Sequence, residues 1–107
     1  MANNYKNAKK DLTDTNATTL YTCPSATVAI VNSILVSNDS GSEDTITLTI
    51  TDSATAVFSV YKLESVGALS TKELLEKSLV VQESEILKVT ATTGGRLHVV
   101  ASFMEVT

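Results

Sequence analysis

One segment alternates strictly between polar and branched apolar residues, and this limits what the chain around it can fold into. Residues 45–51 read Thr-Ile-Thr-Leu-Thr-Ile-Thr. Successive side chains of a β-strand point to opposite faces, so Ile46, Leu48 and Ile50 would share one face and the four threonines the other. The segment therefore predicts a strand in a sheet that has one dry face and one solvent-exposed face.

Similar short segments recur along most of the chain. Further strands are predicted over residues 18–23, 27–37, 56–63, 78–82, 86–92 and 96–107. Turn-forming residues separate these strands, and we expect hairpins at Asp52-Ser53 and at Thr93-Gly94-Gly95, because paired glycines accept the backbone conformation of tight turns. Short strands with a turn about every 8–12 residues predict an all-β, antiparallel β-sandwich or barrel rather than βαβ units.

The two longest predicted strands differ in the composition of their faces. One face of residues 27–37 carries apolar residues interrupted by an asparagine: Val28, Ile30, Asn32, Ile34 and Val36. The other face carries Ala29, Val31 and Leu35, so we expect this strand to be covered on both sides. In the last strand, one face carries Leu97, Val99, Ala101 and Phe103. Because only 5% of the residues are aromatic, the predicted core is mostly aliphatic.

Residues 70–79 fit two structures. Ser70 and Glu73 have the spacing of a capping box, and Glu73 and Lys77 form an i, i+4 pair, so both features favour a short helix. An isolated helix of this length is marginal, and periodicity alone does not separate it from a bent edge strand. The resemblance described below favours the extended structure.

The first 17 residues are polar and show no clear period. We interpret residues 1–17 as an extended N-terminal arm that precedes a β-sandwich domain at residues 18–107. Such an arm would be mobile in a free monomer and could become ordered by lying on a neighbouring subunit. A solvated tail is the simpler interpretation of its lysines. The residues that we expect to contact a partner are Tyr5, Lys6, Lys9, Lys10 and Leu12.

Composition excludes several classes of protein. A formal net charge of −4 gives no help in neutralising phosphates, so nucleic acid is not an expected partner. The single cysteine, Cys23, excludes an intrachain disulfide and lies in apolar surroundings that predict a buried structural thiol. The chain has neither an apolar run that could span a bilayer nor a signal-peptide core, so we expect no membrane contact and synthesis in a cytoplasm.

Residue patterns typical of enzymes are missing. The single histidine, His98, lies in a predicted strand and is interpreted as structural. The sequence has no Gly-x-Ser-x-Gly elbow and no phosphate-binding glycine loop. Asp39, Glu43 and Asp44 crowd one loop, where Ca²⁺ is a possible ligand, but the spacing is not that of an EF-hand and a solvated loop is the preferred interpretation. We therefore expect no metal, no cofactor and no enzymatic activity.

Two segments of the chain carry a resemblance to known proteins. Residues 17–38 contain Leu20-Tyr21-Thr22-Cys23-Pro24 and then a long apolar strand that ends in Ser37-Asn38, and the chain closes with Phe103-Met104-Glu105-Val106-Thr107. With the preceding polar arm, these features resemble small virion structural proteins of tailed bacteriophages, in particular marine and cyanobacterial phages. The sequence departs from that pattern at Cys23 and at Ser25-Ala26.

The resemblance implies a jelly-roll-like β-sandwich that is present in many copies on a virion. It implies a capsid decoration (cement) protein, a homo-oligomer that binds the major capsid protein. A neck, tail or fibre-associated virion subunit fits the same residues. A carbohydrate-binding β-sandwich module is the alternative from another class, although it would need exposed aromatic side chains on a sheet face.

Overall fold

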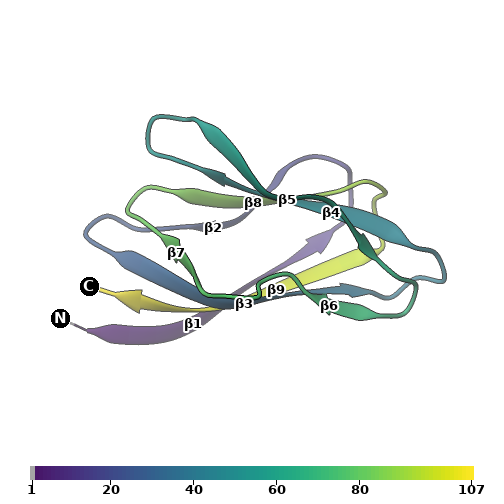
Figure 1. Cartoon of the computed structure of the whole chain (residues 1–107), viewed down its shortest axis with the longest axis horizontal. Coiled ribbons are helices and arrows are strands. Elements are labelled where there is room, and N and C mark those ends of the chain that lie inside the picture. The colour runs from purple at the N-terminus through teal and green to yellow at the C-terminus, as the bar shows by residue number, and fades with distance from the viewer. Residues whose placement is uncertain (1) are drawn as a thin grey trace.

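The computed structural model describes residues 2–107, and within that range it contains β-strands and no helix (Figure 1). The strands are β1 (Asn3–Leu12), β2 (Thr18–Thr22), β3 (Val28–Asn38), β4 (Asp44–Thr51), β5 (Val57–Val66), β6 (Thr71–Glu73), β7 (Leu79–Val81), β8 (Ile86–Ala91) and β9 (Leu97–Val106). Every predicted strand is present, with ends shifted by at most a few residues. The extended interpretation of residues 70–79 is confirmed, since they contain β6 and the start of β7.

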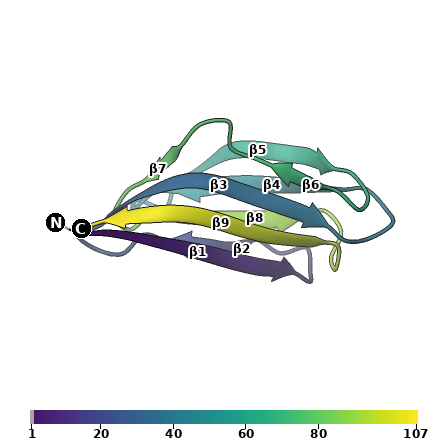
Figure 2. The same ribbon diagram turned by 90° about the horizontal axis from the view of Figure 1, so that it is seen from below.

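The strands form two antiparallel sheets that pack face to face. Sheet A contains β1, β9, β3 and β6 in that order, with β7 also pairing with β3, and sheet B contains β2, β8, β4 and β5. Consecutive strands cross from one sheet to the other, except in the β4–β5 hairpin and between β6 and β7. This order is that of a jelly roll, so the predicted β-sandwich is confirmed. Figure 2 shows β1, β9 and β3 side by side, with both chain termini at one end.

The core lies between the two sheets and is mostly aliphatic. Ile46 and Leu48 are fully buried and lie opposite Ala91 and Val89 of β8, as the alternation predicted. The inward side of β9 holds Leu97, Val99, Ala101 and Phe103, all buried. Each fully buried Val, Leu or Phe side chain contributes about 1.5–3 kcal/mol to folding. The core thus follows directly from period-two alternation in three strands.

In β3 the predicted faces are wrong, because a bulge shifts the alternation. Pairing with β9 passes from Val31 to Ser33, which leaves Asn32 as an extra residue. One extra residue moves every later side chain to the other face. The inward side of β3 therefore holds Ala29 and Val31 before the bulge and Ile34 and Val36 after it.

The edge strand beside β3 is interrupted opposite this bulge. Glu73, at the end of β6, accepts hydrogen bonds from the backbone N–H groups of Ile34 (2.8 Å) and Leu75 (3.1 Å) and from the Ser33 hydroxyl. Leu74 and Leu75 then fill the sandwich edge. The carboxylate that could have capped a helix therefore supports the irregular backbone of β3 and of the segment between β6 and β7.

The predicted hairpin at Thr93-Gly94-Gly95 is wrong, although a tight turn is present there. This segment joins β8 of sheet B to β9 of sheet A, so it crosses between sheets. Gly95 has a φ of 80°, and Gly94 lies so close to the backbone of Thr13 that an added Cβ would be 2.6 Å from the Thr13 oxygen. The glycines therefore serve a crossing and a close approach of two backbones, which sequence alone does not distinguish from a hairpin.

Candidate assembly surfaces

The N-terminal segment is part of the sandwich rather than an arm outside it. Residues 3–12 form β1, the edge strand of sheet A, and pair with β9 in an unbroken register from Asn3 opposite Val106 to Leu12 opposite Leu97. The physical reason is the backbone: β9 would otherwise present an unpaired edge, and β1 satisfies its N–H and C=O groups. The expected division at residues 17 and 18 falls at the start of β2.

The five residues expected to contact a partner are divided between two faces of β1. Tyr5 is 80% exposed and lies opposite Met104 on the outer face, and Lys9 is exposed on the same face opposite Val100. Lys6 and Lys10 lie opposite inward-facing residues of β9, at the rim of the sandwich. Leu12 is only 2% exposed and belongs to the core, so it is unavailable to a partner while β1 is paired in this way.

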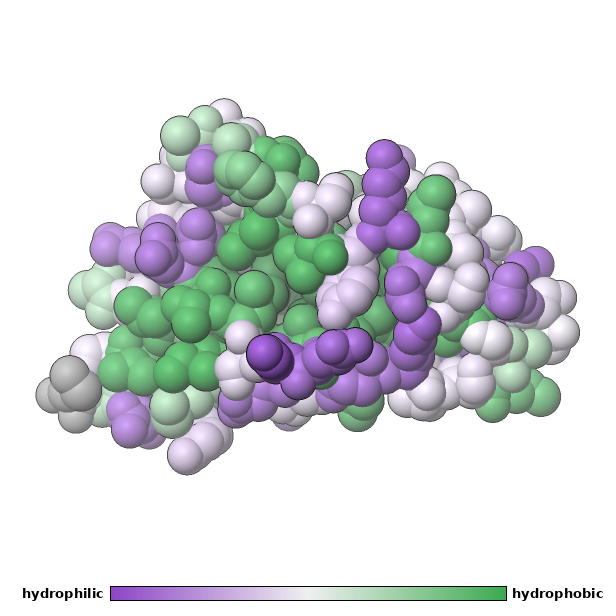
Figure 3. Space-filling view, viewed as in Figure 1, coloured by the Kyte–Doolittle hydropathy of each residue, from purple (hydrophilic) through white to green (hydrophobic). Residues whose placement is uncertain are grey.

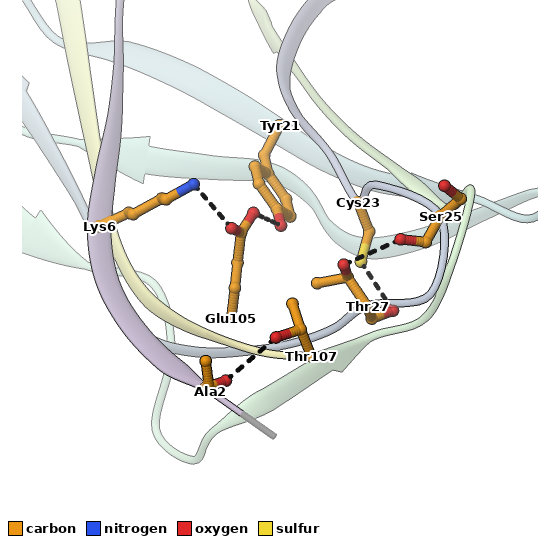
Figure 4. Close-up of polar contacts among 8 residues, drawn as sticks. All are labelled: Ala2, Lys6, Tyr21, Cys23, Ser25, Thr27, Glu105 and Thr107. Atoms are coloured by element: carbon orange, nitrogen blue, oxygen red, sulfur yellow. Dashed lines mark hydrogen bonds and ion pairs between the residues drawn. The ribbon is translucent and has the colours of Figure 1, made fainter.

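The buried carboxylate of Glu105 connects strands β1 and β9 of sheet A with strand β2 of sheet B (Figure 4). Glu105 of β9 is 5% exposed and its carboxylate lies 2.8 Å from the Lys6 ammonium. The Tyr21 hydroxyl of β2 donates a 2.5 Å hydrogen bond to the other carboxylate oxygen. The Tyr21 ring also contacts Phe103, with ring centroids 4.3 Å apart. Lys6 is therefore a structural partner within the chain as well as a residue at the rim.

The surroundings of Glu105 and Tyr21 shift the pKa values of both groups. Hydrogen bonding from Lys6, then from Tyr21, holds the pKa of Glu105 below its usual range, against the effect of burial. Burial raises the pKa of the Tyr21 phenol, and its hydrogen bond to Glu105 adds to that effect. At neutral pH the cluster is thus an ionised carboxylate held by one cation and one neutral phenol.

Cys23 lies at the end of β2 and is buried, as predicted. Its thiol donates to the Thr27 carbonyl oxygen at 3.3 Å, and burial raises the pKa of the thiol. A raised pKa keeps the group in the unreactive protonated form. Cys23 is therefore a small core residue of the β2–β3 connection, beside the Thr27 hydroxyl that donates to the Ser25 carbonyl oxygen (Figure 4).

The outer face of sheet A carries an apolar row at the end where the chain termini lie. Tyr5, Met104, Ile30 and Val80 stand directly opposite one another across β1, β9, β3 and β7. Val28 and Val106 form a second pair next to them. Val80 and Val28 are 51% and 41% exposed. Figure 3 views the sandwich from the edge formed by β6 and β7, and there apolar surface gathers around β7 at this end of the molecule.

Two shallow hollows lie along β1 and β9. The first has a volume of about 340 Å³ and is lined by Tyr5, Lys6, Asn7, Asn32, Ser102 and Phe103. The second has a volume of about 260 Å³ and includes Lys9, Asp11, His98 and Val100. The bulged residue Asn32 and the small Ser102 leave space beside Tyr5. The hollows make this face uneven, and an uneven face can match the shape of a partner at an interface.

The outer face of sheet B has a different chemistry. Over β4 and β8 it carries Thr45, Thr47, Thr49, Lys88 and Thr90, and Thr47 and Thr49 lie opposite Thr90 and Lys88. Hydroxyl groups on this face also bond locally, since the Thr47 hydroxyl accepts from the Leu63 N–H. Thr45, Thr47 and Thr49 are partly exposed, as the alternation predicted, but the prediction is wrong for the fourth threonine, Thr51, which is buried. The surface over β4 and β8 is therefore polar, whereas β5 at the edge of sheet B carries the exposed side chains of Val57, Phe58 and Leu63.

The acidic loop and the histidine have structural partners. Asp44 is buried and accepts hydrogen bonds from the N–H groups of Thr45 and Thr93, which joins the start of β4 to the β8–β9 crossing. Nε2 of His98 lies 3.3 Å from a carboxylate oxygen of Asp11 on β1, and Nδ1 lies 3.8 Å from Asp39. Among residues 2–107, no three His, Cys, Asp or Glu side chains are grouped so that they could hold a metal ion.

Membrane insertion by a helix also finds no support. Across residues 2–107, no helix has the length and apolar character to cross a bilayer.

Comparison with known proteins defines the fold and not the family. No protein-family model matches the chain, and no curated protein sequence matches it. Several solved chains are similar in fold, including the following two. One is of Bacillus endospore appendages, a family of disulfide-linked pili, with a TM-score of 0.60 and 12% identity over 99% of this chain and 87% of that chain. The other is of infectious bursal disease virus, Gt strain, with a TM-score of 0.50 and 8% identity.

The second similarity covers very different shares of the two chains. It covers 98% of this chain but 30% of the viral chain, so this fold corresponds to less than a third of that protein. One neighbour comes from a pilus and the other from a virus, which are both assemblies. At 12% and 8% identity these likenesses show the fold alone, and the class that the fold defines is a jelly-roll sandwich.

The sequence predicted neither strand β1, which it presents as a polar arm, nor the apolar row. Ile30 and Val80 appear in the sequence as ordinary core positions of apolar strands. Only the bulge at Asn32 places Ile30 outward, and only the pairing of β7 with β3 places Val80 beside it. A lone asparagine within an otherwise apolar strand is the signal in the sequence that could have indicated the bulge.

Proposed function

We propose that this chain is a virion structural protein of a tailed bacteriophage, and specifically a capsid decoration (cement) protein that binds the major capsid protein. Support comes from the resemblance in residues 17–38 and 103–107 and from the jelly-roll fold, which it shares with a chain from a virus structure. In this role the protein has no catalytic step, no cofactor, no nucleic-acid partner and no membrane partner. It is made in the host cytoplasm and acts on the virion.

The apolar row on the outer face of sheet A carries the proposal. A permanently solvated protein has little reason to place Tyr5, Ile30, Met104 and Val80 in one row, whereas a subunit that is always docked can cover them. The threonine-rich face of sheet B suits permanent contact with water. We therefore assign the outer face of sheet A to the neighbouring virion subunit and the outer face of sheet B to solvent.

The number of copies per particle tests this proposal against a neck, tail or fibre position. A decoration protein occurs in numbers on the order of hundreds, whereas a ring closed by cyclic symmetry holds about a dozen or fewer. Quantitative mass spectrometry of gradient-purified particles, followed by cryo-electron microscopy, gives both number and position. A count near a dozen would move the chain to the neck or tail. Absence from purified particles would contradict a virion role altogether.

A carbohydrate-binding module is the second candidate, and one observation favours it. Tyr5 is an exposed aromatic side chain on a sheet face, as such a module needs, and Asn7, Asn32 and Ser102 line the hollow beside it. An aromatic ring packs against the apolar face of a sugar, and amide and hydroxyl groups bond its hydroxyls. A glycan array probed with wild type and Tyr5→Ala distinguishes this function, since the virion role requires no glycan signal.

A further inference from the structure

Strand β1 is attached to the body mainly through its backbone. All ten of its residues pair with β9, yet only Leu12 is fully buried and only Ala8 is partly buried against the core. By contrast β3, on the other side of β9, buries Ala29, Val31, Ile34 and Val36. The hydrogen bonds of β1 are therefore independent of its sequence, and few of its side chains specify that it must pair within its own chain.

The body beneath β1 is already closed without it. The inward side chains of β9 face sheet B, and Phe103 contacts the Tyr21 ring. If β1 left, Glu105 would lose Lys6 but would keep the hydrogen bond from the Tyr21 hydroxyl. The one core side chain that would be withdrawn is Leu12. Removal of β1 therefore exposes a sheet edge and one apolar site rather than opening the core.

Charge favours the return of β1 to a body of the same sequence. Residues 2–10 contain three lysines and no acidic residue, whereas residues 11–107 contain five basic and twelve acidic residues, a formal charge of −7. In a second copy, Lys6 would meet an identical Glu105 and Leu12 an identical core site. Exchange between identical copies thus preserves every contact of β1, which is why strand exchange is a low-cost route to oligomers.

The connection to β2 permits this exchange. Residues 13–17 link sheet A to sheet B, and five extended residues span roughly 17 Å. Thr13 and Asp14 pack against Gly94, so residues 15–17 are the free part of this link, and exchange requires a copy whose β9 edge lies directly against this edge. We infer that β1 is an exchangeable strand: in the assembled protein it leaves its own β9 and pairs with β9 of a neighbouring copy of the same chain. The inference deepens the proposed function and rests on it for the expectation that copies lie side by side.

Single-cysteine chains test the exchange. Asn7 and Ser102 lie opposite each other and are both exposed, so cysteines at these positions can form a disulfide without touching the core. The Asn7→Cys and Ser102→Cys chains, each also carrying Cys23→Ala, are unfolded together, refolded together, concentrated and oxidised. We expect a covalent heterodimer on a non-reducing gel, and neither chain alone should give it. A mixture that yields no heterodimer would overturn the exchange.

A matched pair on the other side of β9 provides the control. Leu35 and Val100 are also opposite and exposed, but β3 is fixed in the core, so mixed Leu35→Cys and Val100→Cys chains should remain monomeric on the gel. If Asn7→Cys fails to fold, the pair Lys9→Cys and Val100→Cys repeats the same measurement on β1. All steps use purified protein, so a failed exchange and a failed virion assignment are observed separately.

Discussion

At the scale of single residues, Gly94 lets two backbone segments pack closely because it has no side chain. A Cβ at this position would lie 2.6 Å from the Thr13 oxygen and 2.9 Å from the Asp14 Cα, both backbone atoms that cannot move aside cheaply. We expect Gly94→Ala to lower the free energy of unfolding by about 1–3 kcal/mol. Urea denaturation measures this change. Gly41→Ala is the control, because an added Cβ there meets nothing within 4 Å and should change stability little.

Glu105 makes stability depend on pH in a predictable direction. Because Lys6 and then Tyr21 lower its pKa in the folded state, the carboxylate stabilises the protein above the pKa of the unfolded chain, about 4.3, and loses that contribution as the pH falls through the lower folded pKa. We therefore expect the difference in unfolding free energy between wild type and Glu105→Gln to shrink as the pH falls from about 7 to about 3. Urea titrations at several pH values measure it, and a constant difference would contradict the assigned ion pair.

At the scale of strands, alternation predicts where strands lie but not which strands pair. The period-two pattern placed β8, β9 and the first part of β4 and their inward faces correctly, but at the end of β4 it failed, since Thr51 is buried and Ile50 is only partly buried. It failed in β3, where a single unpaired residue, Asn32, reverses the faces. It also failed at Gly94 and Gly95, because a turn between two sheets uses the same residues as a hairpin. Pairing depends on contacts between distant segments, which a local pattern does not contain.

The same reasoning applies to β1. Its polar sequence has too few apolar residues to indicate a strand, because its outer face is solvated and its inner face lies at the rim of the sandwich. Backbone pairing with β9 supplies what the side chains do not. Of the residues expected to contact a partner, Tyr5 and Lys9 lie on the accessible outer face, Lys6 is held by Glu105, and Leu12 is in the core.

Strand β4 offers a sharp test of the assigned faces. Leu48→Asp would place an unpaired carboxylate among fully buried aliphatic side chains, and we expect it to cost more than about 4 kcal/mol and to abolish cooperative folding. Thr49→Asp is the matched control, since Thr49 lies on the outer face opposite Lys88 and should change stability by less than about 1 kcal/mol. Thermal unfolding followed by circular dichroism compares the two, and near-normal stability of Leu48→Asp would show that the face assignment is wrong.

Deleting residues 2–16 tests whether β1 is separable from the body. We expect a truncated protein that still unfolds cooperatively, because the inward side of β9 remains covered by sheet B. Its stability should fall by about 2–5 kcal/mol, the range for loss of a buried leucine, since Leu12 is withdrawn from the core. Urea denaturation measures the loss. A product without a cooperative transition would show that β1 is required for folding and would contradict its treatment as a separable strand.

At the scale of the whole molecule, the jelly roll presents two broad outer faces, and their chemistry determines how a subunit can be placed in an assembly. Sheet B shows threonines to its surroundings, whereas sheet A shows the row from Tyr5 to Val80. The two edges of sheet A differ as well. One edge is strand β1, which is held by backbone pairing, and the other is formed by the interrupted strands β6 and β7. A molecule whose apolar row lies on one sheet, with a threonine-rich surface over β4 and β8 of the other, is suited to a single layer that has neighbours on the sheet A side.

This orientation predicts different outcomes for a charge placed on each face. Val80→Lys adds a cation at the β7 end of the apolar row and should lower the number of copies retained on purified particles at least about tenfold, the effect of about 1.4 kcal/mol. Thr90→Lys adds the same cation to the threonine-rich face and should leave the copy number unchanged. Quantitative mass spectrometry of particles carrying each variant gives the numbers, after circular dichroism has established that both variants are folded. Loss of Thr90→Lys with retention of Val80→Lys would reverse the orientation, since sheet B would then be the face that meets the capsid.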